Sequence, residues 1–184
     1  METLTKADNL AAIKNNTYQE TKSSTRKPFR KLGFTTMETA EIVITLKKLM
    51  ANYQVYYHKM RNFHWNIEGS DFFELHEEFE NEYNEAKVNV DDLAERIRVF
   101  GIMPSMTMSE VIKISEIKET KDKLSAYEMV KEVLQDYQIL HELMLDVINA
   151  ALETGDIATE NLIADNILEL EKRQLFGGQV APEV

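Results

Sequence analysis

Two histidines and three carboxylates stand at spacings that would suit a metal site. Four of these residues fall on one face of a predicted helix, because separations of four, eleven and four residues connect them: His76, Glu80, Asp91 and Glu95. His64 precedes His76 by twelve residues, at the end of another predicted helix just before a turn, so the two histidines can meet. Imidazole nitrogen and carboxylate oxygen together suit Fe(II), Mn(II) or Zn(II). The spacing therefore indicates a candidate metal site, although an ordinary solvated helix face would show the same pattern.

A metal site inside the core of a single bundle is not expected. Bundles that hold two metal ions in their core carry Glu-x-x-His on two helices. Here the residues three positions before the four histidines are Val55, Arg61, Phe73 and Gln138. We therefore expect no intrachain site, and we interpret the remaining histidines, His58 and His141, as hydrogen-bonded core residues.

The distance along one helix decides how the candidate site could form. His76 and Asp91 are 15 residues apart in the sequence, which is about 22 Å along a helix that rises 1.5 Å per residue. One chain cannot place both residues around one metal ion. Two chains related by a two-fold axis can, if the histidine end of one chain meets the Asp91 and Glu95 end of the other. The spacing therefore predicts an oligomer.

Apolar residues at spacings of three and four predict the elements that position these groups. We expect long helices over residues 36–67, 71–100, 125–154 and 158–175, and a short helix over residues 107–115. Capping residues mark the starts of four of them, namely Thr35, Asp71, Thr107 and Ser125. Gly101 and Gly155 mark two of the ends. The sequence predicts an all-α four-helix bundle with a short helix in the connection between its second and third helices.

Charge is unevenly distributed along the chain. The net charge is −11 overall, but residues 1–36 carry +4 and the remainder carries −15. We expect a mobile basic N-terminal arm over residues 1–35, the bundle over residues 36–176 and a short C-terminal tail over residues 177–184. An acidic body attracts cations and repels nucleic acid.

Composition excludes several classes of protein. The chain has no cysteine, which rules out disulfide scaffolds, thiol catalysis and metal sites that use cysteine. We find no signal peptide and no stretch of about 18 apolar residues. We therefore expect a cytoplasmic protein that does not engage a membrane.

A longer and more specific pattern runs from His64 to Gly101. It reads H-W-N-x₃-S-D-F-F-x-L-H-x₂-F-E-x₂-Y-x₇-D-x-L-A-E-R-I-x₃-G. With this pattern, residues 37–175 resemble the Dps family, the DNA-protection-during-starvation mini-ferritins. The combination of His-x₁₁-His with Asp-x₃-Glu-Arg is highly specific. Leu175 departs from the family, which commonly has Trp at this position.

The resemblance implies a hollow shell of twelve ferritin-like subunits with a di-iron ferroxidase centre at each two-fold interface. By position, His64 and His76 of one subunit would face Asp91 and Glu95 of its partner. Glu80, where the family usually has Asp, would be a further iron-binding carboxylate. The resemblance also implies oxidation of Fe(II), with hydrogen peroxide favoured over O₂, storage of Fe(III) as a mineral, and no organic cofactor.

The resemblance suggests roles for residues outside the ligand set. Trp65 matches a tryptophan that is thought to intercept radicals, and packing at an interface is its alternative role. Four carboxylates match a region that lines an acidic three-fold pore for Fe²⁺, or they are ordinary surface acids: Asp146, Glu153, Asp156 and Glu160.

DNA binding through the arm is a second hypothesis, which would bring nucleoid association with it. The basic residues that could contact DNA are Lys6, Lys14, Lys22, Arg26, Lys27, Arg30 and Lys31. A structural cage without turnover is a third hypothesis, and the complete ligand set disfavours it.

Overall fold

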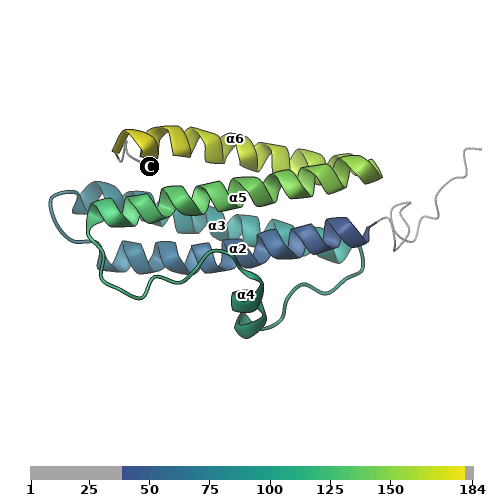
Figure 1. The fold of residues 1–184 in the computed structure, drawn as a ribbon, viewed down its shortest axis with the longest axis horizontal. Helices are drawn as coiled ribbons and strands as arrows, with labels where there is room; N and C mark the ends of the chain where they lie inside the picture. The colour runs from purple at the N-terminus through teal and green to yellow at the C-terminus, as the bar shows by residue number, and fades with distance from the viewer. Residues whose placement is uncertain (1–38, 181–184) are drawn as a thin grey trace, which may run out of the picture. The chain divides into compact units, whose positions relative to one another are not determined.

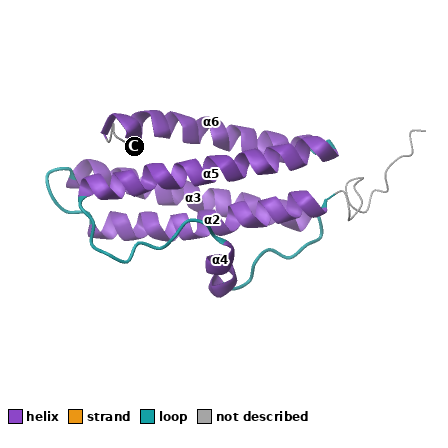
Figure 2. Cartoon of the chain, viewed as in Figure 1, coloured by secondary structure: helices purple, strands orange, loops and turns teal. Residues whose placement is uncertain are grey.

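Helices account for the regular structure in the described part of the chain. The computed structural model describes residues 39–180, with side chains as far as Leu175. Its elements are α2 (Ala40–Asn66), α3 (Phe72–Val99), α4 (Met108–Ile114), α5 (Ala126–Thr154) and α6 (Ile157–Val180). Figure 2 shows helices and loops but no strand over these residues, which confirms the all-α prediction.

The four long helices form a bundle, and α4 lies beside it. α2 packs against α3 and α5, α5 packs against α6, and α4 contacts α2 (Figure 1). The long connection after α3 returns along the bundle, so α3 and α5 run in the same direction (Figure 1). The predicted apolar stripes supply the core, where Leu46, Leu93, Leu140 and Ile163 are fully buried. No helix within residues 39–180 is both long and apolar enough to cross a membrane.

Most predicted helix ends agree with the structure. Ser125 and Glu128 form a complete capping box at the start of α5, and Gly155 ends that helix with φ 69°. Asp71 is an exception, because its side chain makes no capping hydrogen bond. Its backbone lies at φ −94° and ψ 12°, whereas a capping residue normally has extended backbone angles.

The two outer ends of the bundle differ from the expected boundaries. The predicted start near Thr36 lies outside the described residues, and α2 begins at Ala40. At the other end, α6 continues to Val180, so the helix extends through Gly177 and Gly178 into the segment expected to be a tail. The chain divides into two units between Gly33 and Phe34, and the expected arm lies outside the described residues.

One buried side chain fixes the long connection after α4. The amide oxygen of Asn52, which is fully buried on α2, accepts hydrogen bonds from the Ser115 hydroxyl and from the backbone N–H groups of Glu116 and Ile117. These bonds satisfy polar backbone groups at a place where water does not reach. The connection is therefore held at a defined position against α2.

An ion pair ties the C-terminal part of α3 to the start of α6. Arg96 donates two hydrogen bonds to the carboxylate of Asp156, at 2.6 and 2.7 Å, and one to the Thr159 hydroxyl at 2.7 Å. Asp156 is only 3% exposed. Burial raises the pKa of Asp156, but the hydrogen bonds from Arg96 and Thr159 outweigh burial and leave its pKa below the ordinary value of 3.8.

We predict that Asp156→Asn lowers the free energy of unfolding by about 2 kcal/mol at pH 7, because a charged hydrogen-bond acceptor is lost. A lowered pKa stabilises the folded state above pH 3.8, and this contribution disappears as the pH falls through the folded-state pKa. Chemical denaturation from pH 7 to pH 3 should therefore show the two proteins converging in acid. Glu153→Gln, at an exposed carboxylate on α5, is the control. Equal stability of Asp156→Asn and wild type at pH 7 would contradict the prediction.

Candidate metal centre

His64 and His76 meet at the turn between α2 and α3, as the sequence predicts. Their rings stack with centroids 3.8 Å apart and an interplanar angle of 23°. His64 lies in the last turn of α2, and His76 lies in the second turn of α3. The short turn between the helices therefore brings together two imidazoles that are twelve residues apart in the sequence.

Each of the two rings is held by the backbone of the other residue. Nδ1 of His64 lies 2.8 Å from the carbonyl oxygen of His76, and Nδ1 of His76 lies 2.9 Å from the carbonyl oxygen of His64. A carbonyl oxygen only accepts hydrogen bonds, so both Nδ1 atoms must carry the proton. In the neutral rings, the lone pair is then on Nε2 of both histidines. This is the arrangement that metal-binding histidines adopt, with one nitrogen fixed by a backbone carbonyl and the other free to bind.

Aromatic side chains surround the histidine pair. Phe72 stacks on His76 with centroids 4.9 Å apart, and Tyr83 lies edge-on to His64 at 5.4 Å. The Tyr83 hydroxyl donates a 3.1 Å hydrogen bond to the carboxylate of Glu80. Desolvation raises the pKa of Tyr83, and the bond to Glu80 raises it further, so the phenol remains a donor at neutral pH.

Tyr83 thus holds the carboxylate of Glu80, which lies one turn beyond His76. No such role for Tyr83 was predicted from the sequence. The spacing of three residues between Glu80 and Tyr83 places both on one helix face. This spacing is the signal that could have identified Tyr83.

Asp91 and Glu95 are exposed on the same helix as His76, nearer its other end. Because α3 runs unbroken from Phe72 to Val99, the structure does not bring these carboxylates to the histidine pair of the same chain. Within the described residues, no three histidine or carboxylate side chains lie close enough together to hold a metal ion. Completion of the site by a second chain stays a prediction.

Trp65 lies next to the histidine pair in the sequence and is 59% exposed. The guanidinium carbon of Arg61 lies 4.6 Å from the centre of the Trp65 ring and 5.3 Å from that of Tyr57. Arg61 therefore joins Trp65 to a second aromatic ring through cation–π contacts. Both roles considered for Trp65 stay predictions.

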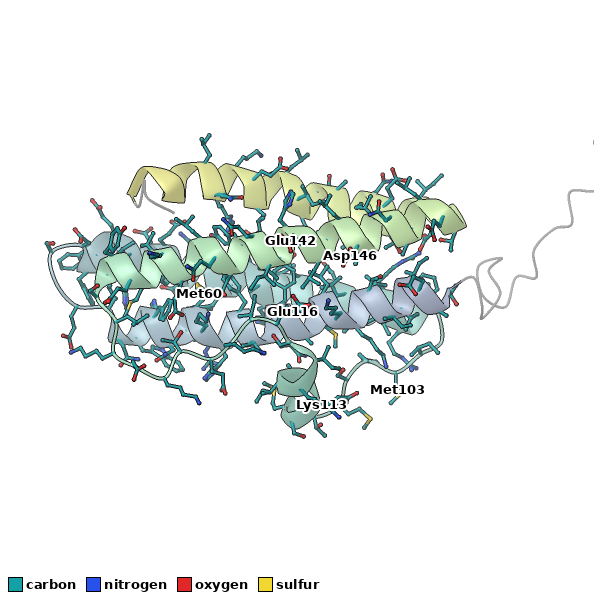
Figure 3. All side chains as sticks on the ribbon, viewed as in Figure 1. Met60, Met103, Lys113, Glu116, Glu142 and Asp146 are labelled. Atoms are coloured by element: carbon teal, nitrogen blue, oxygen red, sulfur yellow. The ribbon has the colours of Figure 1, made fainter. Side chains whose placement is uncertain are left out.

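The four carboxylates of the predicted pore fall into two groups. Asp146 and Glu153 are exposed on α5, where Figure 3 labels Asp146, and Glu160 is half-buried on α6. Asp156 is instead buried and paired with Arg96. Its carboxylate serves a structural contact, so the pore prediction depends on Asp146, Glu153 and Glu160.

The other two histidines do not share one environment. His58 is exposed on α2, so the expectation of a core position is wrong for it. His141 is half-buried, and its Nε2 lies 3.2 Å from a carboxylate oxygen of Glu171. The basic residues of the proposed DNA contact, from Lys6 to Lys31, lie outside the described residues.

Comparison with known proteins identifies the family. A sequence model described as a ferritin-like domain matches residues 45–179. The chain is 39% identical over 137 residues to the DNA protection during starvation protein of Helicobacter pylori. This alignment covers 74% of the present chain and 93% of the H. pylori protein.

Solved structures agree with this match. The Dps protein of Vibrio cholerae, described as a member of a superfamily of ferritin-like diiron-carboxylate proteins, aligns with a TM-score of 0.79 and 33% identity, covering 85% of this chain and 98% of that one. The Dps protein of Staphylococcus aureus aligns with a TM-score of 0.74 and 35% identity, covering 77% and 95%. The chain belongs to the Dps family of ferritin-like proteins.

Proposed function

We propose that this protein oxidises Fe(II) at sites shared by two subunits and stores the Fe(III) product inside an oligomeric shell. The observation that carries the proposal is the paired histidines, whose Nδ1 atoms both face backbone carbonyls. Two imidazoles fixed in this way present Nε2 for metal binding before any metal arrives. Membership of the Dps family supports the same conclusion and favours a dodecameric cytoplasmic shell.

In this proposal, two subunits supply different ligands to the iron substrate. His64 and His76 supply neutral nitrogen ligands from one subunit, while Asp91 and Glu95 of the neighbouring subunit supply oxygen ligands and negative charge. This mixture suits Fe(II), which accepts both nitrogen and oxygen ligands. Glu80, held by Tyr83, adds a carboxylate beside the histidines. The negative charge of the ligand set favours the Fe(III) product over Fe(II).

The proposed reaction uses two Fe(II) ions for each hydrogen peroxide. Each Fe(II) gives up one electron, and two protons complete the conversion of peroxide into two molecules of water. Paired oxidation avoids the hydroxyl radical that one Fe(II) ion alone would generate from peroxide. Molecular oxygen is the alternative oxidant. The exposed acids Asp146 and Glu153 would raise the local concentration of Fe²⁺ near the surface.

We predict that replacing His64 and His76 together by Gly slows Fe(II) oxidation by at least about tenfold, because two metal ligands are lost. Oxidation with peroxide and with O₂ is followed by absorbance, and assembly is followed by size-exclusion chromatography. His58→Gly is the matched control, because it removes an exposed histidine from the same helix. A double variant that assembles and oxidises iron at the wild-type rate would refute the site.

A mixing experiment tests whether two chains share each site. We co-express equal amounts of the double histidine variant with Asp91→Asn and allow subunits to pair at random. Half of the dimers are then mixed, and each mixed dimer has one intact site out of two, so about a quarter of the wild-type sites return. Activity equal to the average of the two parent variants would mean that each chain supplies all its own ligands.

DNA binding through the basic arm is a second candidate function. The observation that favours it is the charge of +4 on residues 1–36, because lysine and arginine bind phosphate without reading sequence. Several arms on one shell would bind together at a high effective concentration. The body charge of −15 opposes this, because it repels phosphate within a Debye length of about 8 Å at physiological salt.

We predict that DNA binding is weak or absent at physiological salt and strengthens at low salt, independently of sequence. Deletion of residues 1–31 should abolish any such binding and leave iron oxidation unchanged. Gel shifts across a salt series, alongside the oxidation assay, measure both properties. DNA binding that survives the deletion would place the contact elsewhere on the molecule. Loss of assembly on deletion would instead make the arm a stabiliser of the shell.

A further inference from the structure

A cluster of polar side chains extends from the interior of the bundle to its surface, where the side chains of Arg173 and Glu85 are 25% and 36% exposed. Each of the four long helices contributes to it: Tyr56 from α2, Glu82 and Glu85 from α3, Tyr137 from α5 and Arg173 from α6. Glu82 is only 4% exposed, and the two tyrosines are 2% and 5% exposed. The mechanism proposed above uses none of these residues.

The carboxylate of Glu82 is the centre of the cluster. Tyr56 donates to one of its oxygens at 2.5 Å, and Arg173 donates to the other at 2.5 Å. The charge of Glu82 also acts on the phenol of Tyr137 and raises its pKa. The second arm of the Arg173 guanidinium donates to Glu85. Burial and the charge of Glu82 raise the pKa of both Tyr56 and Tyr137, so both phenols remain protonated.

The side chains around Arg173 form an oxygen-rich set that carries a net negative charge. Two carboxylates of α3 contact the Arg173 guanidinium. The phenol of Tyr56 donates to one of them, and that of Tyr137 lies within its electrostatic influence. A carboxylate in a bundle core needs a cation nearby, because an unpaired buried charge is strongly destabilising. Oxygen donors from facing helices are also the means by which helical bundles hold metal ions in their cores.

The cluster can be reached from outside the bundle. A cleft of about 380 Å³ opens between α3 and α5 and extends to Glu82, Tyr137 and Arg173. Glu74 and Glu78 also line it, and they would attract cations to it. Access and local charge would therefore both admit a metal ion. Among the described residues, the guanidinium of Arg173 is the cation that contacts Glu82 and Glu85.

We propose that Arg173 is the resident cation of the bundle core and that its guanidinium excludes metal ions from this intrachain set of oxygens. Arg173 acts as a specificity-determining residue, because it confines metal binding to other surfaces of the protein. The inference is independent of the site shared between subunits, since it involves neither histidine of the pair.

The experiment replaces Arg173 by Met, which keeps the length of the side chain but removes its charge. All variants also carry His64→Gly and His76→Gly, so the result does not depend on the shared site. Tb(III) is the probe, because it prefers oxygen ligands and its emission increases when a nearby tyrosine transfers energy to it. Bound Tb(III) per chain is measured by equilibrium dialysis, and emission is excited through tyrosine.

We expect Arg173→Met to bind one more Tb(III) ion per chain than the parent protein, with increased tyrosine-sensitised emission. Arg173→Lys keeps the positive charge and should gain no ion. Addition of Glu82→Gln to Arg173→Met should remove the extra ion and its emission. A merely structural role for Arg173 would lower stability in these variants without creating a stoichiometric ion site.

If Arg173→Met folds poorly, the melting temperature with and without Tb(III) provides a second measurement of ion binding. Tb(III) that binds only the folded state should then raise the melting temperature of Arg173→Met more than that of the parent. The proposal is overturned if a folded Arg173→Met binds no additional ion, if Arg173→Lys gains the ion as well, or if an unstable Arg173→Met is not rescued by Tb(III).

Discussion

The rigidity of α3 is the constraint on which the candidate metal centre depends. This helix runs unbroken from Phe72 to Val99, so His76 and Asp91 are held about 22 Å apart along its axis. No side-chain rotation closes such a distance. The imidazoles and the carboxylates of one chain therefore lie at two different places, and they could share a metal ion only if a second chain brought one pair to the other. If the proposed function is correct, each iron site forms when two subunits pair.

The histidine pair also shows how helix ends can prepare a site. The last four carbonyls of a helix have no partner within that helix, and His64 provides one of them near the end of α2. His76 donates to this carbonyl, and His64 donates to that of His76. A bond that completes the end of α2 therefore also selects which nitrogen of His76 can bind a metal. The same two contacts hold the turn and, on the proposed function, prepare both histidines to bind metal.

The spacing of residues correctly predicted features that depend on nearby residues in the sequence. It did not predict the role of a side chain whose partner lies far away in the sequence. The apolar stripes and the capping box at Ser125 follow from separations of three or four residues. The meeting of His64 with His76 follows from one short turn between two neighbouring helices. Asp156 looked like a surface acid, because its partner Arg96 lies 60 residues earlier on another helix. Likewise, Asp71 has the right side chain for a cap but not the extended backbone that a cap requires.

Ion pairs within the bundle also influence where the negative charge of the body lies. Arg96, Lys59 and Arg173 are each paired with a buried or nearly buried carboxylate, on Asp156, Asp136 and Glu82 respectively. These pairs are close to neutral, so they leave the excess of acidic residues on the rest of the body, which carries −15 over residues 37–184. A net negative charge of this size attracts cations and opposes DNA. On the proposed functions, the charge that would hold DNA is therefore separated along the chain from the charge that would attract iron. Either property could then change without loss of the other.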